Sequence, residues 1–235
     1  MVDFHTHILP GIDDGSESLE ESLQMLRAEK EQGISRVVLT PHFYPQRDIP
    51  ESFLKKREEA FGLLQQAAEQ EELPELVLGA EVYYYPGMSE SAALKELTLD
   101  KTEYVLVEMP FVAWTKDMYR ELENIYARQG LTPIVAHVDR YIRPWRTRGI
   151  PERLQELPVL VQANASFFTS RFTGSLARKL LKEKKIHLLG SDCHDMLSRP
   201  PCLGKLGKNL NREALLQIEE TESRIFVEDG PDKGE

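Results

Sequence analysis

The chain opens with VDFHTH at residues 2–7, a short apolar run that ends in two histidines. Six further runs share its composition, being rich in Val, Leu and Ile and followed by turn or helix signals. Strands that are buried on both faces have this composition, and their alternation with helices predicts a parallel sheet. The further runs are VVLTPH (37–42), LVLGAE (76–81), YVLVE (104–108), PIVAH (133–137), VLVQAN (159–164) and HLLGSDCH (187–194).

Helical patterns fill the intervals between these runs. Ser18 and Glu21 have the spacing of a capping box, and leucines then repeat at helical intervals until Gly33. Residues 51–72 form a longer pattern with one apolar face. Shorter patterns are expected at residues 118–129, 175–185 and 212–220. Seven strand–helix units result, which predicts an α/β fold.

The composition limits the number of domains and the partners. With 235 residues and 41% hydrophobic residues, the chain can bury one large core, so we expect one barrel-sized domain over residues 1–235. Residues 228–235 are polar and are expected to fray. The net charge of −10 argues against a nucleic-acid groove. Bound cations would neutralise acidic ligands locally, so this charge stays compatible with a phosphate substrate.

The chain start and the cysteines indicate the compartment. The first run begins at Val2, with neither a basic segment nor a long apolar segment before it, so we expect no signal peptide. No apolar stretch is long enough for membrane insertion. Cys193 and Cys202 are too few for a disulfide framework. Together these features predict a cytoplasmic protein with free thiols.

Six of the seven runs end in side chains that can bind a metal ion. In parallel α/β barrels the carboxyl ends of the strands meet at one mouth, where catalytic groups collect. His5 and His7 are two positions apart and share one side of a strand, while the two oxygens of Glu81 suit it to bridge two ions. Mixed imidazole and carboxylate ligands suit Mn, Fe or Zn. The nine candidate ligands are His5, His7, Asp14, His42, Glu81, Glu108, His137, Asp192 and His194.

Each candidate ligand also has a simpler explanation. A lone histidine at a strand end is more often a hydrogen-bonded core or surface residue than a ligand, and Asp and Glu are abundant in this chain. However, five of the six histidines fall at predicted strand ends, whereas His187 begins its run. This recurrence favours a metal centre over five independent packing roles.

Several motifs resemble one known family. They are DFHTHILPGIDDG (3–15), TPH (40–42), GAEVYY (79–84), AHVDRY (136–141) and SDCH (191–194), the last followed by RPP (199–201). In combination they resemble the PHP phosphoesterases and, more narrowly, the bacterial protein tyrosine phosphatases of the CpsB/YwqE type. The resemblance extends from Val2 to about Pro201 and so covers most of the chain.

The resemblance implies a distorted, TIM-like (β/α)7 barrel of seven strands and a site for two or three divalent cations, Mn being favoured over Fe or Zn. One cation would lie between His5, His7, Glu81 and Asp192, a second between Glu81, Glu108 and His137, and a third between Asp14, His42 and His194. Cys193 and Asp139 depart from the residues usual in the family, but neither departure removes a ligand.

The resemblance also implies a reaction, the hydrolysis of phosphotyrosine by metal-activated water. The implied partner is a bacterial tyrosine kinase that carries this phosphotyrosine and regulates capsular or exopolysaccharide synthesis. Arg140 and Arg199 stand beside ligand motifs, and a guanidinium fork matches phosphate oxygens, so we expect both to hold phosphate during catalysis rather than to be solvated surface charges. Tyr83 and Tyr85 are candidates for an aromatic wall, with barrel packing as an equal alternative. Asn164 is more simply a turn residue.

Other functions stay open. The same metals with another pocket wall would suit histidinol phosphate or another small phosphoester, and amidohydrolases also begin with His-x-His but usually have eight units. A metal-stabilised binding module without an open coordination position is the non-enzymatic alternative. Cys193 and Arg199 have the spacing of cysteine-dependent phosphatases, but the loop between them lacks Gly and two prolines follow it, so we attribute the spacing to chance.

Overall fold

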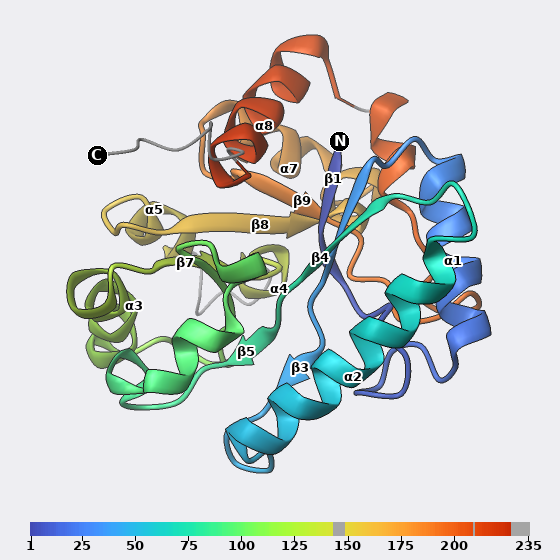
Figure 1. Ribbon diagram of the computed structural model, residues 1–235. Coiled ribbons are helices and arrows are strands. Elements are labelled where there is room, and N and C mark those ends of the chain that lie inside the picture. Colours follow the sequence, from blue (N-terminus) through green and yellow to red (C-terminus); the bar gives the residue numbers. More distant parts are fainter. Residues whose placement is uncertain (143–148, 209, 227–235) are drawn as a thin grey trace, which may run out of the picture.

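The computed structural model describes residues 1–142, 149–208 and 210–226 (Figure 1), so the tail predicted to fray lies outside the described residues. All strand pairs in the described residues are parallel, in one sheet of order β1–β2–β4 and another of order β3–β5–β6–β7–β8–β9. The strands are β1 (Val2–Thr6), β2 (Arg36–Leu39), β3 (His42–Phe43), β4 (Glu75–Leu78), β5 (Glu81–Tyr83), β6 (Tyr104–Glu108), β7 (Thr132–Val135), β8 (Leu160–Asn164) and β9 (Leu188–Gly190).

Helices cover the strands on the outside. In Figure 1, α1 and α2 lie on the opposite side of the strands from α3, and α8 lies near the N-terminus of the chain. The α-helices are α1 (Leu19–Glu31), α2 (Pro50–Ala68), α3 (Lys116–Gln129), α4 (Asp139–Ile142), α5 (Ile150–Leu154), α6 (Ala165–Thr169), α7 (Gly174–Lys182) and α8 (Arg212–Ile225). Short 3₁₀ helices occupy Met88–Glu90, Ala92–Leu97, Leu99–Lys101 and Leu203–Lys208.

The predicted helices are all present, with shifted ends. The helix expected over residues 51–72 ends at Ala68, and the one expected over 212–220 continues to Ile225. The Ser18 hydroxyl accepts a hydrogen bond from the Glu21 backbone N–H (3.2 Å), which caps α1 as predicted. The Glu21 carboxylate, however, accepts from Glu17 rather than from Ser18, so the reciprocal half of the capping box is absent.

The two sheets join into one curled wall. At the β1–β9 junction, the His7 backbone N–H donates to the Cys193 carbonyl (2.9 Å) and the Asp192 N–H donates to the His5 carbonyl (2.8 Å). Elsewhere the two sheets are connected along the chain, since β2 leads into β3 and β4 into β5 across two residues each. The result is a curled parallel sheet of the TIM-like kind, and the predicted α/β fold is confirmed.

The predicted count of seven strands is not confirmed, because nine strands are assigned in the described residues. Two predicted runs, 37–42 and 76–81, are each interrupted. In the first run, Pro41 has no N–H to donate, and the Thr40 hydroxyl accepts a hydrogen bond from the Thr6 N–H (3.1 Å). In the second, the Gly79 carbonyl accepts a hydrogen bond from buried Arg57 of α2 (3.2 Å). At both interruptions a side chain forms a hydrogen bond that, in a regular sheet, would join two backbone groups.

A small apolar cluster on the sheet is separate from the larger one beneath the helices. Phe4, Val38, Leu106 and Ile134 belong to this smaller cluster, and Ile225 at the end of α8 packs with them. The α8 residue Glu222 also accepts a hydrogen bond from the Val2 N–H (3.1 Å), so α8 covers the amino-terminal end of β1. The carboxyl ends of the strands are therefore the edge left for polar groups. None of the helices in the described residues is long and apolar enough to cross a membrane.

Two local features bring β1 close to its neighbours. The pairing of β1 with β2 shifts register between Asp3 and Thr6, and such irregularities re-aim side chains. Gly190 of β9 lies so close to His5 that a Cβ at this glycine would stand 2.6 Å from the Cβ of His5. Only a residue without a side chain allows His5 to take this position.

Candidate metal centre

The structure brings the nine predicted ligands to one mouth, at the carboxyl ends of the strands. Eight of them are buried or nearly so, and Asp14 is the exception, with a side chain that is 71% exposed. β1 positions His5 and His7, β3 His42, β5 Glu81 and β6 Glu108. His137, Asp192 and His194 follow β7 and β9, and Asp14 lies on the loop after β1. The structure therefore brings the nine side chains together, as the strand-end rule predicts.

Glu81 is the centre of this cluster. Its Oε2 lies 3.1 Å from His5 Nε2, 3.4 Å from His7 Nε2 and 3.0 Å from His42 Nδ1. Its Oε1 lies 2.9 Å from Nε2 of His137. One carboxylate thus contacts four imidazoles through both of its oxygens, so it is placed to be shared by two cations if these bind.

The remaining ligands form two further groups around Glu81. Oδ1 of Asp14 lies 3.6 Å from His42 Nε2 and 3.7 Å from His194 Nε2. Glu108 lies 3.4 Å from His137 Nε2 and 3.9 Å from His42 Nδ1.

The three predicted ligand sets overlap more than the resemblance implied. His7 belongs to a possible cation site with Asp14, His42 and His194 as well as to one with His5 and Glu81. His42 joins Glu81 and Glu108 in a third possible site. The two histidines are therefore each shared by two candidate cation sites, and the structure places Glu108 near His42 as well as near His137.

The nitrogen and oxygen atoms of this cluster are better placed to bind a cation than to form hydrogen bonds with one another. Within the described part of the chain, His42 Nδ1, Glu81 Oε2 and His194 Nε2 are buried without a hydrogen-bond partner. Glu81 Oε2 nevertheless has three imidazole nitrogens within 3.4 Å. The Nε2 atoms of His5 and His7 also face each other at 3.2 Å. Buried polar atoms are normally paired, so a cluster of facing, unpaired donors indicates a place for metal ions.

Two of the ligands have strained backbones. His137 has φ of 31° and Asp192 has φ of 56°, in the left-handed region that few residues other than glycine adopt. Such strain persists only where the surrounding structure holds it, and it gathers at functional sites. The strain aims both side chains into the mouth.

The surrounding charges shift the pKa values of neighbouring histidines in opposite directions. Burial alone would lower the pKa of His7, but the neighbouring Asp13 and Glu81 carboxylates outweigh burial and raise it to about 10. Burial lowers the pKa of His194 to about 4, and the positive charges of His7 and Arg199 add to that effect. A cation must therefore displace a proton from His7, whereas His194 is already neutral at neutral pH.

Arg140 and Arg199 both reach the mouth and contact the same ligand. Arg140 Nη2 donates to Oδ2 of Asp192 (2.5 Å), and Arg199 Nη2 lies 2.7 Å from Oδ1. Burial would raise the pKa of Asp192, but the charges of His5 and Arg140 hold it well below its usual range. A cavity of about 370 Å³ adjoins this group, and Arg140, Arg199, Asn164 and Asp192 all line it. The two guanidinium groups are thus placed at the wall of an open space beside the ligands.

Asn164, predicted to be an ordinary turn residue, takes part in the site. Its Nδ2 donates to Oδ2 of Asp192 (3.0 Å), and its backbone N–H donates to Asp139 (3.0 Å). Asp139 therefore positions Asn164, and Asn164 positions a candidate ligand.

Two positioning residues were missed from the sequence. Asp13 Oδ2 lies 2.7 Å from Nδ1 of His7 and accepts a hydrogen bond from the His42 N–H (2.9 Å). Gln162 Oε1 accepts from the His137 N–H (2.6 Å) and lies 3.3 Å from Nδ1 of His5. The adjacent carboxylates Asp13-Asp14 were a signal for the first. Gln162 gave none, because a lone glutamine inside a strand looks like any polar strand residue.

The aromatic residues near the mouth differ from those expected. Tyr85 is half-buried and packs against the main core, so it does not form a wall. The Tyr83 ring lies 5.7 Å from the ring of Tyr44, which in turn lies 4.9 Å from the His42 ring. Phe111, on the loop after β6, has its ring 5.9 Å from that of His137. Tyr44, Tyr83 and Phe111 are thus aromatic side chains near the site that are at least partly exposed.

Cys193 is unsuited to act as a nucleophile. Its side chain is fully buried, and burial together with the nearby Glu29 and Asp3 carboxylates raises the pKa of the thiol well above its usual range. The reactive form of cysteine is the thiolate. Burial and the raised pKa of the thiol therefore argue against the cysteine mechanism that the spacing between Cys193 and Arg199 would suggest.

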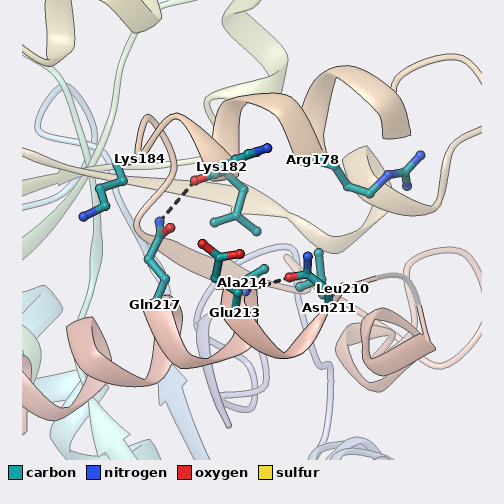
Figure 2. Close-up of a pocket in the computed structure, with 9 residues that line it drawn as sticks. Arg178, Lys182, Lys184, Leu210, Asn211, Glu213, Ala214 and Gln217 are labelled. Carbon is teal, nitrogen blue, oxygen red and sulfur yellow. Dashed lines mark hydrogen bonds between the residues drawn. The ribbon is translucent and has the colours of Figure 1, made fainter.

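A cavity of about 310 Å³ lies away from this centre, between α7 and α8. Figure 2 shows that Arg178 and Lys184 in its lining point to opposite sides. Gln217 donates to the Leu181 carbonyl (3.2 Å), and Asn211 accepts from the Ala214 N–H (2.9 Å), so both amides serve the packing of α8. The polar groups of this cavity do not converge on a common point.

Known proteins are similar to this chain over nearly its whole length. The family model "Capsular polysaccharide synthesis, CpsB/CapC" matches residues 1–231. The tyrosine-protein phosphatase CpsB of Streptococcus agalactiae serotype V is 30% identical over 240 residues, which cover 97% of this chain and 96% of that protein. The tyrosine-protein phosphatase YwqE of Bacillus subtilis is 31% identical over 216 residues, covering 85% and 79% of the two chains.

A solved structure has the same fold. It comes from work on YwqE from Bacillus subtilis and CpsB from Streptococcus pneumoniae, described as unique metal-dependent tyrosine phosphatases. The two chains superpose with a TM-score of 0.80 at 24% identity, covering 95% of this chain and 93% of the other.

Proposed function

The chain belongs to the CpsB/CapC family of capsular polysaccharide synthesis, and from that membership we propose that it is a metal-dependent protein tyrosine phosphatase, a phosphoric monoester hydrolase. The family resemblance inferred from the motifs is thereby confirmed. The observation that carries the proposal is the convergence of nine candidate ligand side chains and two arginines at one mouth.

The nine side chains would hold two or three divalent cations, with Mn as the favoured ion and Fe or Zn as alternatives. We assign one ion to His5, His7, Glu81 and Asp192, a second to Glu81, Glu108 and His137, and a third to Asp14, His42 and His194. The short contacts of Glu81 with four imidazoles support its position in two of these sets. When bound, the cations would supply positive charge for the phosphoryl oxygens and lower the pKa of a water molecule.

The side chains of the protein would contribute by positioning the phosphate group. Arg140 and Arg199 present guanidinium groups at the wall of the cavity beside the ligands, where they would bind phosphate oxygens. Phosphoryl transfer depends mainly on such positioning and charge stabilisation. A tyrosine leaving group has a pKa of about 10, so its departure needs little help from a general acid.

The wider assignments follow from the same membership. We propose that the substrate is phosphotyrosine on a bacterial tyrosine kinase that regulates capsular or exopolysaccharide synthesis, in the cytoplasm. We further propose that residues 1–235 form one domain, a distorted barrel in which each interrupted run counts as one of seven strands. The parallel pairing of all described strands and the β1–β9 junction support this view of the barrel.

Hydrolysis assays on the metal-stripped protein test the proposal. Purified protein is assayed with a phosphotyrosine peptide and with p-nitrophenyl phosphate before stripping, after stripping with a chelator, and after return of manganese. We expect turnover to disappear on stripping and to return with manganese. Turnover that is indifferent to stripping would refute the metal mechanism. Absence of turnover in every state, with histidinol phosphate hydrolysed instead, would replace the substrate.

A further inference from the structure

Phe111 stands at the mouth with its ring open to solvent. It follows the buried strand β6 and the buried residue Met109, yet it is 54% exposed. Its ring lies 5.9 Å from that of His137 and stacks on Tyr141 at 5.6 Å between ring centres. One face of the ring is therefore supported by the protein, while much of the side chain is free to contact a ligand.

The loop that carries Phe111 is held in place. The Tyr141 hydroxyl donates to the Met109 carbonyl (2.9 Å) and accepts from the Met109 N–H (2.8 Å). Tyr141 itself is fully buried. The position of the exposed ring is thus fixed by a buried neighbour, which lowers the entropy that a ligand contact would cost.

Phe111 also lies next to the group assigned to phosphate. The guanidinium carbon of Arg140 is 5.8 Å from the centre of the Phe111 ring. In an aryl phosphate one ester oxygen joins the ring to phosphorus. A phosphate held by Arg140 beside the ligands would therefore bring its aryl ring to the neighbourhood of Phe111.

Tyr44 and Tyr83, the other aromatic residues near the mouth, are more covered than Phe111. The Tyr44 ring has the Arg47 guanidinium 4.1 Å from its centre and the Tyr83 ring at 5.7 Å. Phe111 is more exposed than this group and stands on the same side as Arg140, so it is the aromatic residue best placed to meet a substrate ring.

We propose that Phe111 is a specificity-determining residue that packs against the aromatic ring of the substrate and makes the site prefer aryl phosphates to alkyl phosphates. This inference rests on the proposed phosphatase function. Aromatic pairs prefer offset or edge-to-face contacts, and Phe111 offers both a face and an edge. An alkyl phosphate would occupy the same phosphate position without gaining this contact.

Inhibition by phosphonates tests the inference without the complication of different leaving groups. Benzylphosphonate carries a ring and ethylphosphonate does not, and each is measured as a competitive inhibitor of p-nitrophenyl phosphate hydrolysis. We expect Phe111→Ala to raise the inhibition constant of benzylphosphonate roughly threefold to tenfold, the scale of one aromatic contact, and that of ethylphosphonate less than about twofold. Phe111→Tyr should retain wild-type values, and Phe111→Leu should fall between.

The neighbouring Val112 provides a matched control, since it lies on the same loop and is 57% exposed without being aromatic. Val112→Ala should change neither constant, and metal content should be equal in all variants. Equal changes for both phosphonates, or no change for either, would overturn the role of Phe111. If the wild-type protein hydrolysed no phosphoester, the proposed function would fail. Calorimetric titration of the manganese-loaded protein with the two phosphonates would then still show whether Phe111 contributes to binding of the aromatic ring.

Discussion

The Asp13 carboxylate and the His7 imidazole are joined by a contact of 2.7 Å between Oδ2 and Nδ1. This contact leaves Nε2 of His7 facing Glu81. A carboxylate in this position fixes both the ring orientation and the nitrogen that stays free for a cation. Asp13 also accepts a hydrogen bond from the His42 N–H, so it positions two ligands that come from different strands.

Asp13→Asn should therefore weaken metal binding although Asp13 itself holds no cation. Loss of such a partner typically costs about tenfold to hundredfold in metal affinity, and we expect a decrease of that size for manganese. Calorimetric titration of the stripped protein measures it. The control is Asp117→Asn on α3, where the carboxylate is 81% exposed. Equal affinity in the two variants would show that His7 keeps its orientation without Asp13.

Glu81→Gln should remove metal and activity together. Glu81 contacts four imidazoles through two oxygens, and an amide can neither carry the charge nor bridge two cations in the same way. We expect the metal content to fall and turnover to drop by about a hundredfold or more, as when a principal electrostatic stabiliser is lost. Glu75→Gln, at the exposed first residue of β4, is the control. A variant with full metal content and full rate would refute the bridging role.

The stability of the stripped protein should fall as the pH rises. The pKa of His7 is raised from 6.5 to about 10, and that of His137 from 6.5 to about 9. Their protonation therefore stabilises the fold fully below pH 6.5, and this contribution disappears as the pH passes 9 and then 10. Manganese binds the neutral rings, so the metal-loaded protein should lack this loss.

Thermal unfolding of the stripped and the manganese-loaded protein between pH 6.5 and pH 10 measures the effect. We expect the difference between their Tm values to widen with pH. In the acidic direction, protons compete with the metal for imidazole, so activity should decline. A difference in Tm that stayed constant over this range would mean that the two histidines are not protonated in the stripped protein.

Arg140→Ala and Arg199→Ala should each lower kcat/KM for p-nitrophenyl phosphate by about tenfold to hundredfold, the effect of one charged hydrogen bond. Because both side chains contact Asp192, the double variant should lose less than the product of the single losses. Arg120→Ala, an exposed residue of α3, is the control. Unchanged kinetics in both single variants would leave the two arginines with a purely structural role at Asp192.

Cys193→Ser should retain most of the activity. The thiol is buried and its pKa is raised, so it is protonated at neutral pH and cannot attack phosphorus. Steady-state kinetics and metal analysis of the variant test this expectation together. Loss of nearly all turnover with the metal content intact is the result that would restore a cysteine mechanism.

The sequence was sufficient to predict that the nine candidate ligands lie together, because their positions follow from a general rule. His5 stands one residue before the end of β1, whereas His42 and Glu81, predicted to end their runs, begin the short strands β3 and β5. The carboxyl ends of such parallel runs meet whatever the details of the fold. The role of Gln162 depends instead on the distance between β8 and its neighbours, which no local pattern encodes. The same holds for Asn164, whose contact with Asp192 spans 28 positions.

The interruptions of the strands were also beyond sequence reasoning. The run 76–81 is continuously apolar up to its candidate ligand, and nothing in it announces that the Gly79 carbonyl bonds to an arginine from α2. The overlap of the ligand sets has a similar cause. His7 and His42 approach one another to 4.5 Å between ring centres, and only the curvature of the sheet determines that approach.

The β1–β9 junction has a consequence for the order in which the protein can be made. Asp3 accepts a hydrogen bond from the Ser191 N–H across 188 positions of the chain, and the ligands on either side of that bond come from opposite ends of the sequence. Domains generally fold as units as the chain emerges during synthesis. A growing chain presents His5 and His7 first, long before Asp192 and His194 exist to complete the coordination. A stalled or truncated product therefore carries exposed imidazoles that can capture cations but cannot assemble the centre.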